Sequence, residues 1–386
     1  MKRVLFVDDE QKVLDGLKRM LYPMRNEWAM TFVSSGHDAL DALSRAEYDL
    51  MITDLRMPGM NGIELLTEVV KSYPEVVRIV LSGTADQEIT LRSTALAHQF
   101  LLKPCDTSIL RNTVDRAFKL RAMFESPEMK QVVSTVHKLP SVPALYVQLV
   151  NAIQSPDSSA AEIGRLIKQD VGMTAKVLQL VNSAFFGVRR QIADPAEAVI
   201  YLGAETLREL VLVASVFSSF RPKPARNFSI EAQHSHSLAV GSLARNIAKS
   251  LGLAKADIDY AYVGGLLHAV GKLVLACEQP VKYEAVLKRA AEAQIPERFA
   301  ELEIFGTTHA EVGAYLLWLW NIPDPITEVV LRHHEAPPER RAPATPSIIV
   351  YLADALVHKG SEEAQALEYL TAIGLQEELA EWAHWN

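Results

Sequence analysis

Five short apolar runs at the start of the chain constrain its fold more than any other feature. The runs are RVLFV (3–7), AMTFV (29–33), DLMIT (49–53), VRIVL (77–81) and QFLL (99–102). Runs that are apolar throughout are typical of strands buried on both faces of a parallel sheet. The segments between them have helical spacing, as residues 10–22 do. This alternation predicts a doubly wound α/β domain with a five-stranded parallel sheet.

Polar residues follow these runs at the points where the predicted strands end. They are Asp8 and Asp9 after the first run, Asp54 after the third, Ser82 after the fourth and Lys103 after the fifth. The carboxyl ends of parallel strands meet at one edge of a sheet, where α/β proteins bind ligands. Three carboxylates there call for a hard cation such as Mg²⁺, and a lysine and a hydroxyl beside them suit a phosphoryl group. We therefore predict a site in which one carboxylate acts as nucleophile and forms an acyl phosphate.

Four motifs in residues 1–124 resemble the receiver domain of two-component response regulators. They are VDDE (7–10), DLRMPGMNGIELL (54–66), LSG (81–83) and FLLKP (100–104). The resemblance implies the strand order 2-1-3-4-5 and a sensor histidine kinase as partner. It also implies a role for each polar residue: Asp54 as phosphoacceptor, Asp8, Asp9, Asp54 and the carbonyl of Arg56 as Mg²⁺ ligands, Ser82 and Lys103 as phosphoryl-binding groups, and Ser82 with Phe100 as the switch pair.

Strand patterning disappears from about residue 130 onward, and helical spacing replaces it. Apolar residues recur at that spacing in 161–186, 196–219, 237–251, 260–276, 281–293, 309–320 and 324–334. Pro and Gly separate these segments, as expected where helices end. The sequence therefore predicts a second, all-α domain.

The helical part contains motifs that resemble the HDOD family, a helical relative of the HD and HD-GYP phosphohydrolases. They include LPSVP (139–143), IKQDVGMTAKVLQLVNSAFFG (167–187), GGLLHAVGK (264–272) and VVLRHHE (329–335). We accordingly divide the chain into a receiver domain (1–124), a helical linker (125–138), an HDOD domain (139–337), and a loop with C-terminal helices packed on that domain (338–386).

The resemblance also implies where an HD-type metal site would lie. Its candidate remnants are His236, His268, His309, His333, His334 and Asp354. However, the bridging aspartate of an HD pair is replaced by Ala269, and no GYP-like triplet follows residues 333–335. We favour core or surface histidines with satisfied hydrogen bonds, and the alternative is a mononuclear transition-metal site built from imidazoles. His234 is expected at the surface.

Charge and hydropathy exclude some function classes. Residues 1–124 carry 16 Lys and Arg against 17 Asp and Glu, and the remainder carries 23 against 30. This balance argues against direct nucleic-acid binding, which relies on a basic excess. The most apolar stretch outside the predicted sheet, residues 210–217, is far too short to span a membrane. Two cysteines form no disulfide framework, so we expect a cytoplasmic protein.

These observations favour a response regulator whose phosphorylation repositions a non-catalytic HDOD domain that binds a protein or nucleotide. The main alternative is a cyclic di-GMP phosphodiesterase with an altered metal site, for which Asp354 or Glu335 would have to replace the missing carboxylate. A transcription factor ranks third, because no helix-turn-helix signature is present. Dimerisation through the last helices of the receiver domain is left open.

Overall fold

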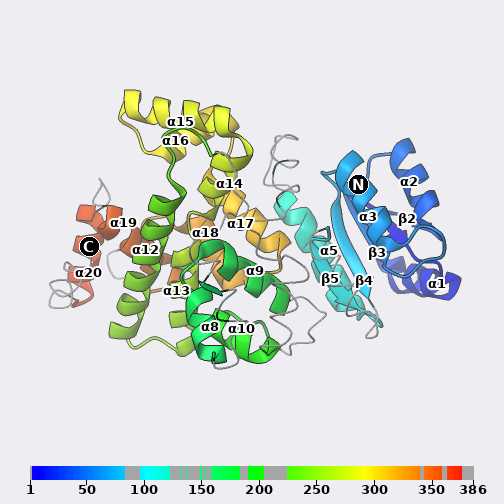
Figure 1. The fold of residues 1–386 in the computed structure, drawn as a ribbon, viewed down its shortest axis with the longest axis horizontal. Coiled ribbons are helices and arrows are strands. Elements are labelled where there is room, and N and C mark those ends of the chain that lie inside the picture. Colours follow the sequence, from blue (N-terminus) through cyan, green and yellow to red (C-terminus); the bar gives the residue numbers. More distant parts are fainter. Residues whose placement is uncertain are drawn as a thin grey trace. The chain divides into compact units, whose positions relative to one another are not determined.

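The structure is a computed structural model of the 386-residue chain. It describes residues 2–82, 96–121, 158–182, 190–203, 224–339, 343–358 and 363–375, together with positions 132, 136, 148, 149 and 152. The chain divides into two compact units, one built on Met1–His137 and the other on Lys138–Gln179, Arg190–Trp318 and Ile322–Asn386. Each unit is described by itself below (Figure 1).

The first unit contains a parallel sheet of five strands. They are β1 (Lys2–Val7), β2 (Trp28–Val33), β3 (Leu50–Asp54), β4 (Val77–Ser82) and β5 (Gln99–Leu102). Their order is β2-β1-β3-β4-β5, and each pair of neighbouring strands is parallel. The predicted strands and their order are therefore confirmed. β3 is buried along its whole length, as a central strand covered on both faces must be.

Helices cover this sheet. They are α1 (Gln11–Met20), α2 (Gly36–Arg45), α3 (Gly62–Ser72) and α5 (Thr107–Arg121), with a short 3₁₀ turn η1 (Tyr22–Met24). Asn61 and Glu64 form a reciprocal capping box at the start of α3, which satisfies two backbone donors at once. α2 and α3 share one core with one face of the sheet.

The second unit is helical throughout the residues described. Its helices are α8 (Ala160–Ile167), α9 (Val171–Val181), α10 (Pro195–Leu202), α12 (Ile230–Ser250), α13 (Lys255–Leu267), α14 (Val270–Glu278), α15 (Pro280–Ala293), α16 (Glu297–Phe305), α17 (His309–Leu319), α18 (Asp324–Arg332), α19 (Pro346–His358) and α20 (Glu363–Ala372). An all-α second domain is thus confirmed.

Several helix boundaries differ from those predicted. The segment 161–186 is interrupted at residues 168–170, where Asp170 accepts a hydrogen bond from the backbone of Met173 and so caps a new helix. The segment 260–276 is interrupted at His268 and Ala269, and α16 was not predicted at all. The linker 125–138, apart from positions 132 and 136, and the last residues from 376 lie outside the described part of the chain, as do residues 204–219.

The core of the helical unit lies between α12, α13 and α19. A Cβ on Gly265 of α13 would lie 2.8 Å from the Cα of Gly241 in α12, so two glycines allow these helices to approach closely. Among the described residues, Lys255–Glu278 is long and apolar enough to cross a membrane, but 78% of its most apolar window is buried inside the unit. Such burial is typical of a core helix.

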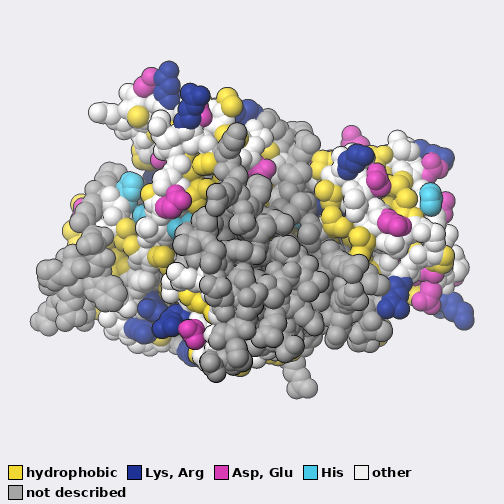
Figure 2. Space-filling view, viewed as in Figure 1, with side chains coloured by type: hydrophobic (Ala, Val, Ile, Leu, Met, Phe, Trp, Pro, Cys, Tyr) yellow, Lys and Arg dark blue, Asp and Glu magenta, His cyan; other side chains and the backbone are white. Residues whose placement is uncertain are grey.

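Charged side chains of both signs are interspersed on the visible surface. On the face that Figure 2 shows, Lys and Arg side chains of the described residues lie in separate groups with Asp or Glu nearby. This pattern agrees with the lack of a basic excess in the sequence.

Candidate functional site

The carboxyl edge of the sheet brings together three of the predicted polar residues. Nζ of Lys103 lies 2.6 Å from Oδ2 of Asp8 and 2.8 Å from Oδ1 of Asp54. Both carboxylates are buried, with Asp8 at 1% and Asp54 at 7% exposure. Two buried anions side by side require a cation between them, and Lys103 fills that role here.

The other predicted residues of this edge have differing surroundings. Asp9 follows Asp8 and is exposed, while Phe100 is 6% exposed within the core of the unit. The backbone amide of Arg56 donates to Oδ2 of Asp54 at 3.0 Å. Ser82 is the last residue of β4, and its side chain lies outside the described part of the chain.

A close approach of the backbone shapes the loop after β3. A Cβ on Gly62 would lie 2.3 Å from the carbonyl oxygen of Asp54, and the Gly62 amide donates to the carbonyl of Leu55. Only glycine allows the start of α3 to lie this close to the end of β3. The end of β3, which carries Asp54, is therefore packed closely against the start of α3.

A pocket of about 470 Å³ in the helical unit is lined by the six predicted remnants of an HD-type site. His236 lies on α12, His268 follows α13, His309 begins α17, His333 and His334 follow α18, and Asp354 lies on α19. The histidines converge on this pocket, and His268, His309 and His333 are also buried and hydrogen-bonded, as expected of core histidines. They form two clusters, His309 with His333 and His334, and His236 with His268 and Asp354.

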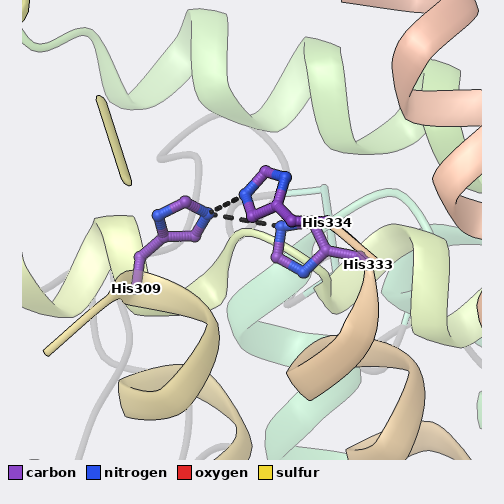
Figure 3. Close-up of side chains that lie close together, drawn as sticks. All are labelled: His309, His333 and His334. Atoms are coloured by element: carbon purple, nitrogen blue, oxygen red, sulfur yellow. Dashed lines mark hydrogen bonds between the residues drawn. The ribbon is translucent and has the colours of Figure 1, made fainter. Parts of the chain in front are cut away.

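In the all-imidazole cluster the three rings turn their Nε2 atoms toward one another (Figure 3). Nε2 of His309 lies 3.3 Å from Nε2 of His333 and 3.0 Å from Nε2 of His334. The opposite nitrogens of His309 and His333 are bound elsewhere: Nδ1 of His309 lies 2.7 Å from Glu301, and Nδ1 of His333 lies 2.8 Å from the carbonyl oxygen of Val330. Because both partners are acceptors, Nδ1 carries a hydrogen in each ring, and the hydrogen bond between the two Nε2 atoms requires a lone pair on one of them.

The second cluster combines two imidazoles with a carboxylate. Nε2 of His236 lies 2.9 Å and Nε2 of His268 lies 3.5 Å from the same Oδ1 of Asp354. Nδ1 of His268 donates to the carbonyl oxygen of Gly265 at 2.7 Å, which again leaves the lone pair on Nε2. A nitrogen lone pair and a carboxylate oxygen therefore face the same point.

The surroundings keep this pocket in the protonation state that metals require. Burial lowers the pKa of His268 to about 4 and that of His333 well below its usual value. Burial alone would raise the pKa of Asp354, but the adjacent imidazoles of His268 and His236 hold it well below its usual value. Near neutral pH the imidazoles of His268 and His333 are thus neutral and the carboxylate of Asp354 is ionised, which are the forms that bind transition metals.

Comparisons with known proteins identify both units. Residues 139–336, about half of the chain, match the family model described as HDOD domain. The chain belongs to the HDOD family. Residues 4–115 match the response regulator receiver domain, so the HDOD domain follows a receiver domain on the same chain.

Other proteins are similar to parts of this chain. The MmoQ response regulator of Methylococcus capsulatus str. Bath is 25% identical in its crystal structure, with a TM-score of 0.54, 64% of this chain covered and 98% of that one. A protein of Treponema pallidum (strain Nichols) is 28% identical over 62% of this chain and 46% of its own length. The hydrogenase transcriptional regulatory protein HoxA of Cupriavidus necator is 38% identical over 31% of this chain and 25% of its own length. The chain therefore spans less than half of these two relatives.

The donor sets fit different cations in the two units. Receiver domains in general bind Mg²⁺, and the carboxylates of Asp8 and Asp54 are the oxygen ligands that this ion prefers. In the HDOD domain, five imidazoles and one carboxylate suit Zn²⁺, Ni²⁺ or Fe²⁺ instead. A transition-metal ion held there would supply a Lewis acid for a bound phosphate ester.

The sequence did not predict that Glu301 and Lys272 lie next to the histidine pocket. Glu301, fully buried on α16, accepts hydrogen bonds from both the backbone amide and Nδ1 of His309. A carboxylate behind a ligating histidine fixes the orientation of its ring. Lys272 lies on the pocket wall with its Nζ 2.7 Å from Glu297. No short motif marks these residues, because they meet only when α16 folds against α14 and α17.

His234 was also misplaced by the sequence argument. It was expected at the surface, but it is 2% exposed, and its Nδ1 lies 3.5 Å from the amide of Val171. The helical spacing correctly separates it from His236, which lies on the pocket. The face of α12 that points away from the pocket is buried as well, because other helices pack against α12 on more than one side.

Proposed function

We propose that this chain is a phosphorylation-dependent response regulator. Asp54 accepts a phosphoryl group, and the change at the carboxyl edge of the sheet alters how the HDOD domain binds its partner. A receiver domain implies a cognate histidine kinase, and we place the protein with that kinase in the cytoplasm. The observation that carries the proposal is the pair of ion contacts from Lys103 to Asp8 and Asp54.

Physical chemistry gives each residue of this edge a part in the proposed reaction. A phosphoryl group on Asp54 would take over the contact with Lys103, because its oxygens carry more negative charge than a carboxylate. Asp8 would then be left to bind Mg²⁺ with Asp9 and the carbonyl of Arg56. Ser82 and Phe100 would move with the phosphoryl group, which is the kind of local change that biases a two-state element.

Labelling with a small phosphodonor tests the assignment of the acceptor. Wild-type protein with Mg²⁺ and acetyl phosphate should acquire one phosphoryl group, and Asp54→Asn should acquire none. Asp41→Asn is the matched control, because Asp41 is exposed and pairs with Arg45 on the same helix. Labelling of Asp54→Asn at the wild-type level would show that another residue is the acceptor.

The second candidate is hydrolysis of a phosphodiester such as cyclic di-GMP in the histidine pocket. The convergence of nitrogen lone pairs and an ionised carboxylate on the pocket favours it. The absence of a carboxylate at Ala269 opposes a metal pair bridged in the HD manner. Turnover of cyclic di-GMP by protein supplied with Mn²⁺ or Fe²⁺ and a phosphoryl mimic distinguishes the candidates: turnover that is lost in His268→Ala makes the domain a phosphodiesterase, and no turnover leaves a binding module.

A further inference from the structure

Gln294 ends α15 in a backbone conformation that normally favours glycine. Its φ is 53°, in the left-handed region where a Cβ crowds the backbone. The amide of Ile295 donates to the carbonyl of Ala290, which is the closing hydrogen bond of a Schellman cap. A glutamine in the left-handed position of this cap costs stability, and such strain persists where the side chain has a function.

Other residues with positive φ follow the usual preferences. The caps of α12 and α20 close with the same kind of hydrogen bond, but Gly252 and Gly374 occupy the left-handed position. Elsewhere in the described part of the chain, Asn227 and Asn321 are the non-glycine residues with positive φ, and asparagine is a side chain that tolerates this region. Gln294 departs from both patterns.

The side chain of Gln294 lines the histidine pocket. The residue is exposed, and among the described residues none forms a hydrogen bond with its side-chain amide. Apolar side chains of α15 and of the turn into α16 line the pocket beside it: Leu287, Ala290, Ala291, Ile295 and Pro296. The histidines and Asp354 reach the pocket from other helices. The pocket therefore has an apolar wall that carries one amide group, and a polar wall of imidazoles.

We propose that Gln294 recognises the base of an adenine nucleotide bound in this pocket. A carboxamide presents a donor and an acceptor side by side, which match N7 and N6 of adenine, whereas guanine presents two acceptors at the same edge. The apolar wall suits the face of a planar base and leaves the polar wall for the ribose phosphate. A volume of about 470 Å³ is within the range of small-molecule sites. This inference rests on the proposed binding of a ligand by the HDOD domain.

Isothermal titration of full-length protein with AMP, GMP and ribose 5-phosphate tests the proposal. The three ligands carry the same phosphate, so the ratio of their affinities reports on the base, whatever group binds the phosphate. AMP should bind at least about tenfold more tightly than GMP or ribose 5-phosphate, the discrimination expected of one bidentate contact to a base. Equal affinities for AMP and GMP would overturn the proposal.

Gln294→Gly separates recognition from folding. Glycine is favoured at a φ of 53°, so the variant should unfold at a higher temperature than wild type. Its preference for AMP over GMP should nevertheless disappear. Asn227→Gly is the matched control, because it relieves a positive φ of 64° at a residue outside the pocket, and it should keep the preference. A wild-type preference in Gln294→Gly would show that another group recognises the base.

Labelling of Asp54 by acetyl phosphate in the same preparation separates this proposal from the proposed function. If Asp54 is labelled but the protein binds no nucleotide, only the adenine site fails. If Asp54 is not labelled either, the proposed function fails as well. Tighter binding of GMP than of AMP would contradict the role of Gln294 and would favour the guanine-containing substrate of the second candidate function.

Discussion

Nε2 of His309 and Nε2 of His333 lie 3.3 Å apart in a hydrogen bond, while Nδ1 of each ring contacts another acceptor. A metal ion between the two Nε2 atoms would take both as ligands in place of that hydrogen bond.

Glu301→Gln should weaken binding of a transition metal by about 10–100-fold, the usual effect of removing a carboxylate behind a ligating histidine. An amide can still accept from Nδ1 of His309, but it lacks the charge that raises the basicity of the ring. Isothermal titration of metal-stripped protein with Zn²⁺ measures this. Glu303→Gln on the same helix, where the side chain is exposed and pairs with Arg289, should bind as wild type does. Equal affinities in the two variants would contradict a role for Glu301.

Gly271→Ala should destabilise the helical unit by about 1–3 kcal/mol, as overpacking does, and should also displace His309. A Cβ at this position would lie 1.9 Å from the carbonyl oxygen of His309 and 2.8 Å from the amide of Gly313, so α14 and α17 must separate. Urea unfolding measures the change. Gly16→Ala is the control, because its Cβ would meet no atom within 4 Å, and it should stabilise α1 by about 0.4–1 kcal/mol.

Lys103→Gln should lower the free energy of unfolding by about 3 kcal/mol in metal-free buffer, because it leaves Asp8 and Asp54 buried without a cation. Burial opposes the charge on Lys103, but its hydrogen bonds to Asp54 and Asp8 raise its pKa overall, so the cation is present at every physiological pH. Mg²⁺ should restore more stability to the variant than it adds to wild type. If the variant is as stable as wild type without Mg²⁺, the ion contacts contribute nothing.

The ion pair between Lys272 and Glu297 should make the helical unit sensitive to acid. Burial raises the pKa of Glu297, but the adjacent ammonium of Lys272 outweighs it and leaves this pKa below the ordinary value of 4.5. The unfolded chain therefore binds the proton first, so the stabilisation is complete above the ordinary pKa and is lost as pH falls through the lower, folded value. The difference in unfolding free energy between wild type and Glu297→Gln should shrink as the solution is acidified through this range. A difference that stays constant would show that the pair does not titrate in this way.

The sheet of the receiver domain could be predicted from the sequence because its signals are local. Each strand is a continuous apolar run, and the polar residue after it lies at the sheet edge by topology alone. The contact between Lys103 and Asp8 joins residues 95 positions apart, yet it follows from the parallel order of the strands. Only details such as the close approach of Gly62 to Asp54 needed coordinates.

The sequence indicated which histidines and which aspartate belong to the pocket, but not how they lie relative to one another. His236 and Asp354 meet from positions 118 residues apart, and helical spacing does not say which helices will be neighbours. The replacement at Ala269 directed the sequence argument away from a metal site. The hydrogen bonds that set the tautomers of His268 and His333 go to backbone carbonyls, which leave no mark in the sequence.

We expect the convergent imidazoles of the HDOD domain to bind a transition metal, and the metal content of the purified protein tests this claim. Metal-stripped wild-type protein, dialysed against Zn²⁺ and then against buffer, should retain at least one ion per chain by elemental analysis. His309→Ala should retain less, and His37→Ala, a histidine of the receiver domain outside the pocket, should match wild type. Retention of no zinc by wild type, or equal retention by wild type and His309→Ala, would contradict the claim.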